Sequence, residues 1–112
     1  MFSFNDTRRW YDRVVAAPGG SNSGLANAQS FARFYPIPGM NHRGGGPATD
    51  QFDVLTPLVA WVKQGLAPKA ITATANAQSG FANRTRPLCA YPQVARYKGT
   101  GSLEEASNFV CE

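Results

Sequence analysis

The chain has 112 residues, the length of one small domain, and a formal net charge of +4 at pH 7. Hydrophobic residues make up 43% and charged residues 16%, which is typical of a folded globular chain and not of a disordered tail. No run of about 18 apolar residues is present, which excludes a transmembrane helix. Charged and polar groups interrupt the opening MFSFNDTRRW, so this segment does not have the pattern of a signal peptide.

The first predicted element is a helix over residues 5–17, which Ser3 or Asn5 can cap because a short side-chain oxygen accepts the unpaired N–H groups of a first turn. Its apolar stripe comprises Trp10, Tyr11, Val14 and Val15. Glycine, serine and asparagine then predict a loop over residues 18–30. The segment Phe31–Ile37 is predicted to be a strand.

The second predicted helix covers residues 50–65. Its apolar face comprises Phe52, Leu55, Val59, Val62 and Leu66. Thr49 or Asp50 can cap it, and Gly65 can end it in the left-handed conformation. Pro57 lies inside the pattern and is expected to kink the helix or to delay its regular part by a turn.

A short β-branched strand is predicted at Ile71–Ala75. The rest of the chain, from Asn76 onward, is expected to be mostly irregular, with a possible helical turn at Leu103–Ser107. This order of elements predicts an α/β protein with parallel strand pairing. Two strands cannot form such a sheet alone, because parallel sheets are normally buried on both faces.

A basic stretch without acidic residues comprises Arg84, Arg86, Arg96 and Lys98. With Tyr91 and Tyr97 nearby, it could attract a phosphate backbone. The alternative is a solvated loop region in which arginine stems pack on aromatic rings. The alternative is favoured, because no recognised nucleic-acid motif accompanies the charge.

His42 is the only histidine and lies in a glycine-rich loop over residues 38–50. The loop follows a predicted strand, and α/β folds place functional groups at the carboxyl ends of strands. An imidazole can take up and return a proton at neutral pH, so His42 is a candidate general base. It can equally be a loop histidine that caps a carbonyl, and the residues alone do not decide between the two.

The glycine run after His42 has two further interpretations, neither of which is favoured. HRGGG is similar to the HGGG oxyanion motif of esterases, but that motif precedes a G-x-S-x-G nucleophile elbow, which this sequence lacks. Glycines 44–46 could cradle an anion with backbone N–H groups, but the G-K-[ST] ending of a phosphate-binding loop is missing.

The two cysteines, Cys89 and Cys111, together with one histidine cannot complete a four-ligand zinc site. A disulfide is the favoured interpretation. It would fasten the C-terminal tail, stabilise the fold by about 3 kcal/mol and imply an oxidising compartment. Two buried free thiols in a cytosolic protein are the alternative.

Three segments resemble the C-terminal portion of the tannase and feruloyl esterase family. These are FSFNDTRRWYDRV (residues 2–14), PGMNHRGGGPATDQFDVLTPLVAWVKQGLAP (38–68) and RTRPLCAYPQVARYKGTGSLEEASNFVCE (84–112). The resemblance implies a secreted α/β-hydrolase with an inserted lid. Such an enzyme hydrolyses esters of aromatic acids, galloyl or hydroxycinnamoyl for example, through a Ser-His-Asp triad and an acyl-enzyme. It assigns the triad histidine to His42, and it pairs Cys89 with Cys111.

The sequence departs from the family pattern at two points. The family usually has a cysteine directly after the catalytic histidine, paired with a cysteine beside the nucleophile, and here that position is Arg43. The family's nucleophilic serine and triad aspartate are expected upstream of Met1. Asp6 matches the start of a helix and not the triad acid. The family's calcium site belongs to the lid, so we expect no metal and no cofactor.

Residues 1–112 are therefore expected to be the C-terminal segment of a single α/β-hydrolase catalytic domain, without its lid and N-terminal half. The expected architecture is an incomplete, mostly parallel sheet with flanking helices and an irregular tail tied by a disulfide. The expected activity is hydrolysis of small aromatic esters by a secreted or periplasmic enzyme with no nucleic-acid or membrane partner, and this chain would supply only His42. The alternative is a non-catalytic basic binding module or a non-functional truncated stub.

Overall fold

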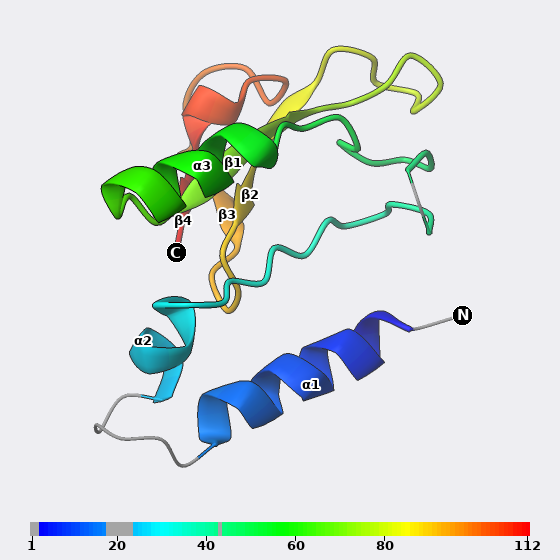
Figure 1. The fold of residues 1–112 in the computed structure, drawn as a ribbon. Coiled ribbons are helices and arrows are strands. Elements are labelled where there is room, and N and C mark those ends of the chain that lie inside the picture. The colour runs from blue at the N-terminus through cyan, green and yellow to red at the C-terminus, as the bar shows by residue number, and fades with distance from the viewer. Residues whose placement is uncertain (1–2, 18–23, 43) are drawn as a thin grey trace. The chain divides into compact units, whose positions relative to one another are not determined.

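A computed structural model describes residues 3–17, 24–42 and 44–112, which belong to two compact units, residues 1–34 and 35–112 (Figure 1). The first unit holds helices α1 (Phe4–Ala16) and α2 (Gly24–Gln29). The second unit holds α3 (Leu55–Gln64), β1 (Ala70–Thr74), β2 (Thr85–Cys89), β3 (Ala95–Tyr97), the 3₁₀ turn η1 (Ala106–Asn108) and β4 (Phe109–Cys111).

Helix α1 confirms the first predicted helix. Ser3 is its cap: the hydroxyl oxygen accepts a hydrogen bond from the Asp6 N–H at 3.2 Å. On the apolar stripe only Tyr11 is fully buried, and its hydroxyl donates to the carbonyl of Ala32 at 2.9 Å. The rings of Phe4 and Tyr11 each lie 5.9 Å from that of Phe34. The aromatic residues of α1 therefore anchor the chain that follows α2.

Two predictions in this unit are wrong. Part of the predicted loop is helix α2, whose first residue, Gly24, lies so close to the Val15 carbonyl that a Cβ would clash. Residues 18–23 of that loop lie outside the described residues. The strand expected at Phe31–Ile37 does not form, because its beginning completes the end of α2: the N–H groups of Phe31 and Ala32 donate to the Ala28 carbonyl.

Helix α3 confirms the second predicted helix only from Leu55 onward, as the delay ascribed to Pro57 predicts. The caps expected from Thr49 or Asp50 are wrong. Asp53 accepts hydrogen bonds from the N–H groups of Leu55 and Thr56 at 2.9 and 3.1 Å. Gly65 ends the helix in the left-handed conformation at φ 69°, as predicted. No residue of α3 is buried, and Leu55 and Val62 are 66% and 78% exposed.

Strand β1 confirms the predicted strand, but the expected parallel pairing is wrong for the strand pairs in the described residues. β1 pairs antiparallel with β2, Ala70 opposite Cys89 and Thr74 opposite Thr85. The connection over residues 75–84 is too short for a parallel crossover, which needs a dozen or more residues. The Thr85 N–H points away from β1 to the Glu104 carbonyl at 2.8 Å. Because backbone N–H groups alternate in direction along a strand, the nitrogen of Pro87 also faces away from β1. Its lack of an N–H therefore removes no hydrogen bond between β1 and β2.

The tail is more regular than predicted. β3 pairs antiparallel with β4, and the predicted helical turn corresponds to η1. The core of the second unit is small: Ile71, Ala73 and Leu88 are buried. Tyr35, Ile37 and Phe52 pack against them. The core therefore lies against β1 and β2, and it receives apolar anchors from both sides of the segment that contains His42.

Across residues 3–17, 24–42 and 44–112, no helix is long and apolar enough to cross a membrane.

Candidate active site

The glycine-rich loop lies between two residues anchored on the core, Ile37 before it and Phe52 after it. Its backbone turns sharply at Gly39 and Gly46, with φ of 78° and 82°. A Cβ on Gly46 would lie 2.5 Å from the Gly39 carbonyl oxygen. Both the left-handed conformation and this close approach require glycine at position 46, because any side chain would force the two ends of the loop apart.

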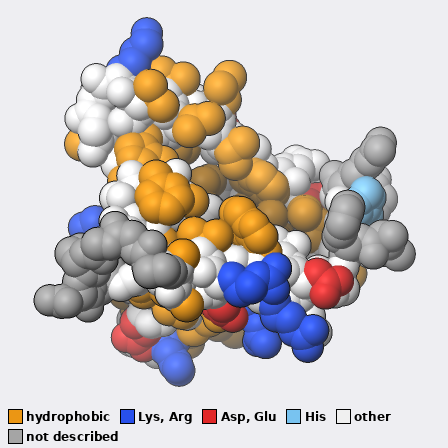
Figure 2. All heavy atoms as spheres, turned by 60° about the horizontal axis from the view of Figure 1, so that its bottom comes forward, with side chains coloured by type: hydrophobic (Ala, Val, Ile, Leu, Met, Phe, Trp, Pro, Cys, Tyr) orange, Lys and Arg blue, Asp and Glu red, His pale blue; other side chains and the backbone are white. Residues whose placement is uncertain are grey.

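Between Gly39 and Gly46, two backbone hydrogen bonds are made by the residues near His42. The Asn41 N–H donates to the Gly45 carbonyl at 3.1 Å, and the Gly44 N–H donates to the Asn41 carbonyl at 3.3 Å. His42 lies within this small ring of hydrogen bonds and is exposed. The single histidine is accordingly seen at the molecular surface in Figure 2, in pale blue. The imidazole is thus presented outward by a compact backbone turn.

Asp50 links this loop to the sheet. One carboxylate oxygen accepts the Gly45 N–H at 2.5 Å, and the other accepts the side-chain amide of Asn76 at 2.8 Å. These hydrogen bonds, from Asn76 first and then from Gly45, hold the pKa of Asp50 below its ordinary value. Asp50 is therefore a carboxylate acceptor at neutral pH.

Backbone hydrogen bonds strengthen the same junction. The N–H of Gln51 donates to the Thr74 carbonyl at 3.0 Å, and the N–H of Thr74 donates to the Gln51 carbonyl at 2.8 Å. Thr74 is the last residue of β1, so the base of the His42 loop is attached at the carboxyl end of a strand. The expected strand directly before His42 is absent from the described residues, and the loop is instead attached to a strand that comes later in the chain.

The N–H groups of Gly44 and Gly45 are already used within the loop. The Gly44 N–H donates to Asn41 and the Gly45 N–H donates to Asp50. An anion cradle built from these two groups would have to break both bonds. No group of three histidine, cysteine, aspartate or glutamate side chains that could hold a metal occurs in the described part of the chain. Arg43 lies outside the described residues.

Sequence reasoning misses Asp50 and Asn76 as parts of the site. The pattern marks Asp50 only as a possible helix cap and Asn76 only as the start of an irregular segment. They lie 26 residues apart and meet only because Gln51 pairs with Thr74. No local pattern indicates such a contact. The oxygen of the Asn76 side chain also accepts the Gln78 N–H at 2.8 Å, so Asn76 shapes the turn after β1 as well.

The basic stretch makes local contacts. Arg84 forms a bidentate ion pair with Glu104, in which Nε and Nη2 donate to the two carboxylate oxygens at 2.6 and 2.8 Å. Its guanidinium also lies over the ring of Phe81. The Arg86 guanidinium lies 4.1 Å from the centre of the Phe109 ring. These contacts are those that the packing interpretation predicts.

The remaining two basic side chains also have local partners. Arg96 lies 3.3 Å from Glu112, and the Lys98 ammonium donates to the Ser107 carbonyl at 2.8 Å. Together with Arg84 and Arg86, they place every member of the basic stretch against a neighbouring group of this part of the chain.

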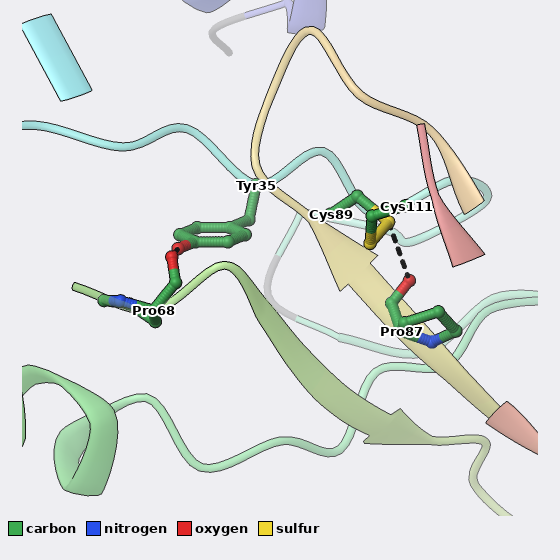
Figure 3. Close-up of a disulfide and its surroundings, with 5 residues drawn as sticks. All are labelled: Tyr35, Pro68, Pro87, Cys89 and Cys111. Carbon is green, nitrogen blue, oxygen red and sulfur yellow. Dashed lines mark hydrogen bonds between the residues drawn. A yellow bond between two sulfur atoms is a disulfide. The ribbon is translucent and has the colours of Figure 1, made fainter. Parts of the chain in front are cut away.

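The disulfide between Cys89 and Cys111 is present and joins the end of β2 to the end of β4 (Figure 3). In the same view, the hydroxyl of Tyr35 points to the carbonyl of Pro68, to which it donates a hydrogen bond. The backbone of Thr85 and its hydroxyl make further hydrogen bonds to Glu104 and Ala106. The tail is therefore attached to β2 at both ends of that strand.

Residues 3–112 match the family model described as tannase and feruloyl esterase. The chain belongs to the tannase and feruloyl esterase family. The match spans both units, including the His42 loop and the disulfide-tied tail.

Similar proteins are considerably longer than this chain. It is 52% identical over 112 residues to a mono(2-hydroxyethyl) terephthalate hydrolase of Piscinibacter sakaiensis, covering 98% of this chain and 17% of that protein. It is 40% identical over 122 residues to an uncharacterized esterase of Xanthomonas campestris pv. campestris, covering 93% and 21%.

A solved structure shows the same relation. The crystal structure of feruloyl esterase B from Aspergillus oryzae matches with a TM-score of 0.73 and 28% identity, covering 98% of this chain and 24% of that one. The folded segment thus corresponds to about a quarter of that esterase and to less of the other two proteins.

Proposed function

We propose that this chain forms the C-terminal part of an α/β-hydrolase domain and supplies the catalytic histidine of a carboxylic ester hydrolase that cleaves esters of aromatic acids. The observation that carries this proposal is the position of His42. The only histidine is exposed on a closed glycine loop attached to the carboxyl end of β1, in a chain whose residues 3–112 match the family.

In the proposed mechanism the His42 imidazole takes the proton of a serine hydroxyl while the serine oxygen attacks the ester carbonyl carbon. The tetrahedral intermediate collapses, the alcohol leaves with the proton held by His42, and an acyl-enzyme remains. His42 then takes a proton from water while the water oxygen attacks the acyl carbon. The second tetrahedral intermediate collapses, the aromatic acid leaves, and the proton passes from His42 to the serine oxygen. The serine and the triad aspartate come from polypeptide other than these 112 residues, which contain no G-x-S-x-G elbow.

Helix α3 supports the proposed place in a larger domain. Its apolar residues are exposed to an extent unusual for a helix with so regular an apolar face. Leu55, Leu58, Val59 and Val62 are between 43% and 78% exposed. A contiguous exposed apolar face normally marks an interaction surface, and the remainder of an α/β-hydrolase domain is the surface that such a helix covers.

Two features support the proposed substrate and compartment. The relatives are named for esters of ferulic and terephthalic acids, which are aromatic acids. The Cys89–Cys111 disulfide is typical of proteins that fold in an oxidising compartment, so we place the protein in the periplasm or outside the cell.

The test grafts residues 3–112 into the Piscinibacter hydrolase in place of its matching segment. Hydrolysis of mono(2-hydroxyethyl) terephthalate and of methyl ferulate is measured with the graft, with His42→Ala and with His42→Gln. Both variants are expected to lower kcat by about 10³-fold or more, because neither side chain can accept the serine proton. Pro47→Ala, an exposed substitution in the same loop, is the matched control and is expected to leave kcat unchanged.

A second arm separates His42 from its neighbour. Arg43→Cys in the graft restores the cysteine that the family usually has after the histidine. Activity that appears only with Arg43→Cys and still requires His42 supports the proposed role of His42. Equal activity of the graft and its His42→Ala variant would exclude it. The 112-residue chain alone is expected to hydrolyse none of these esters.

A further inference from the structure

We propose that Asp50 is a positioning residue for His42, acting together with Asn76. The carboxylate of Asp50 joins the glycine loop that carries the imidazole to Asn76, which follows β1. In this way it fixes the direction in which His42 is presented. This inference rests on the proposed function of His42, and it adds to that function the groups that hold the histidine in place.

The first step is the bridge itself. Asp50 receives one donor from each side: the Gly45 N–H at 2.5 Å from the loop and the Asn76 side-chain amide at 2.8 Å from the end of β1. Hydrogen bonds to a charged acceptor are about twice as strong as neutral ones. The half-buried carboxylate therefore joins two segments that are far apart along the chain.

The second step connects this bridge to His42. The Gly45 carbonyl accepts the Asn41 N–H, and the Asn41 carbonyl accepts the Gly44 N–H. Gly45 is thus at once the residue held by Asp50 and a member of the ring of hydrogen bonds around His42. A displacement of Gly45 is therefore passed to Asn41 through their hydrogen bond and to Gly44 through the chain.

The third step is the need for such a bridge. Glycine has more conformational freedom than any other residue, and the loop after His42 contains three glycines in a row. The pairing of Gln51 with Thr74 holds the chain only after the loop has ended. Asp50 directly precedes this pairing, and its side chain accepts the Gly45 N–H, so it holds the loop itself.

The experiment uses hydrogen exchange of the Gly45 amide in the 112-residue chain, followed by mass spectrometry. Asp50→Asn brings two side-chain amides together, and Asn76→Asp brings two carboxylates together. Each single substitution is expected to speed exchange about tenfold or more.

The double variant, Asp50→Asn with Asn76→Asp, exchanges the roles of the two side chains. The amide oxygen at position 50 then accepts from Gly45, and the amide N–H at that position donates to the carboxylate at position 76. That carboxylate can still accept the Gln78 N–H. The double variant is expected to return exchange to within about threefold of the unsubstituted chain.

Asp53→Asn is the matched control. Asp53 is also an aspartate that accepts two hydrogen bonds, but both donors are backbone N–H groups of α3 and neither belongs to the loop. It is expected to leave Gly45 exchange unchanged. An unprotected Gly45 amide in the unsubstituted chain would overturn the inference. So would single variants without effect, or a double variant that exchanges as fast as the single ones.

The grafted hydrolase supplies the catalytic readout. Asp50→Asn is expected to lower kcat about tenfold with KM unchanged, and the double variant to recover most of it, because binding groups are untouched while the base is misplaced. Faster exchange with an unchanged kcat would overturn the positioning role of Asp50. Full activity of His42→Gln would instead disprove the proposed function, while the exchange data would still report whether Asp50 holds the loop.

Discussion

Helix α3 and the C-terminal tail (residues 95–112) belong to the same unit but are stabilised in opposite ways. A disulfide, an ion pair and hydrogen bonds from Thr85 attach the tail to β2 and its approach. Helix α3 has well-formed ends at Asp53 and Gly65, yet none of its residues is buried. Specific bonds can hold a segment with little apolar surface, whereas most helical stability comes from packing an apolar face against another surface. The tail is held by contacts among the described residues, whereas the large aliphatic side chains of α3 remain exposed.

The largest expected effect concerns the tail. Replacing both Cys89 and Cys111 by serine is expected to lower the free energy of unfolding by about 3 kcal/mol, because the bridge closes a loop in the unfolded chain between cysteines 22 positions apart. Urea unfolding followed by circular dichroism measures the change. The unsubstituted chain under reducing conditions should unfold with the same midpoint as the double variant. A midpoint unchanged by both treatments would show that the tail is attached without its disulfide.

The next effect concerns the beginning of α3. Asp53→Ala is expected to lower the helical signal at about 222 nm, because the N–H groups of Leu55 and Thr56 lose their acceptor. Asp53→Asn, which can also cap, should keep most of it. Equal losses in the two variants would indicate that α3 does not depend on this cap.

The same aspartate predicts a pH dependence. Hydrogen bonds, first from the Thr56 side chain and then from its N–H, hold the pKa of Asp53 below its ordinary value. Its contribution to stability is therefore complete above the unfolded-state pKa and is lost as pH falls through the lower folded-state pKa. The helical signal of the unsubstituted chain should decrease below about pH 4 more than that of Asp53→Asn. Parallel acid titrations of the two would contradict this assignment.

A smaller effect is expected from the ion pair in the tail. The hydrogen bond from Arg84 lowers the pKa of Glu104. Its contribution to stability is present above the ordinary glutamate pKa and is lost as pH falls through the lower folded-state value. Because both side chains are partly exposed, Glu104→Gln should lower the urea midpoint only slightly, and about 1 M salt should reduce the difference. A salt-independent difference would point to packing instead of charge.

The smallest effect on stability, but a clear effect on solubility, is expected from Val62→Lys. Val62 is 78% exposed, so its replacement removes almost no buried surface and should change the unfolding free energy by less than about 0.5 kcal/mol. It should raise the concentration at which the isolated chain associates, because it interrupts the apolar face of α3. Leu103→Lys adds the same charge in the tail and is the control. Equal effects of the two on association would assign the change to charge alone.

Local signals predicted the elements whose causes are local. The apolar stripe around Tyr11 predicted α1, Gly65 predicted the end of α3, and the β-branched run at Ile71 predicted β1. The prediction for segment 31–37 failed because its first residues complete α2, a choice that depends on the preceding helix. β2 was missed because Arg86 and Pro87 give it no strand-like pattern, and it forms through its pairing with β1.

The candidate site divides in the same way. His42 was identifiable from the sequence, because a single histidine in a glycine-rich loop within a family-like motif is a local signal. The cysteine pair followed from counting and from the family resemblance, and the structure contains the bridge. The role of the histidine stays a prediction until the grafted enzyme is measured.

The sequence by itself therefore determined the family and the helices with strong periodicity, favoured the disulfide and made His42 a candidate. All of these depend on residue identity or on contacts a few positions apart. Only the tertiary structure decided the antiparallel pairing, the attachment of the loop to the end of β1 and the meeting of Asp50 with Asn76. The physical reason is that these contacts join distant segments. Their free energy comes from hydrogen bonds that exist only after the backbone of both segments has been brought together.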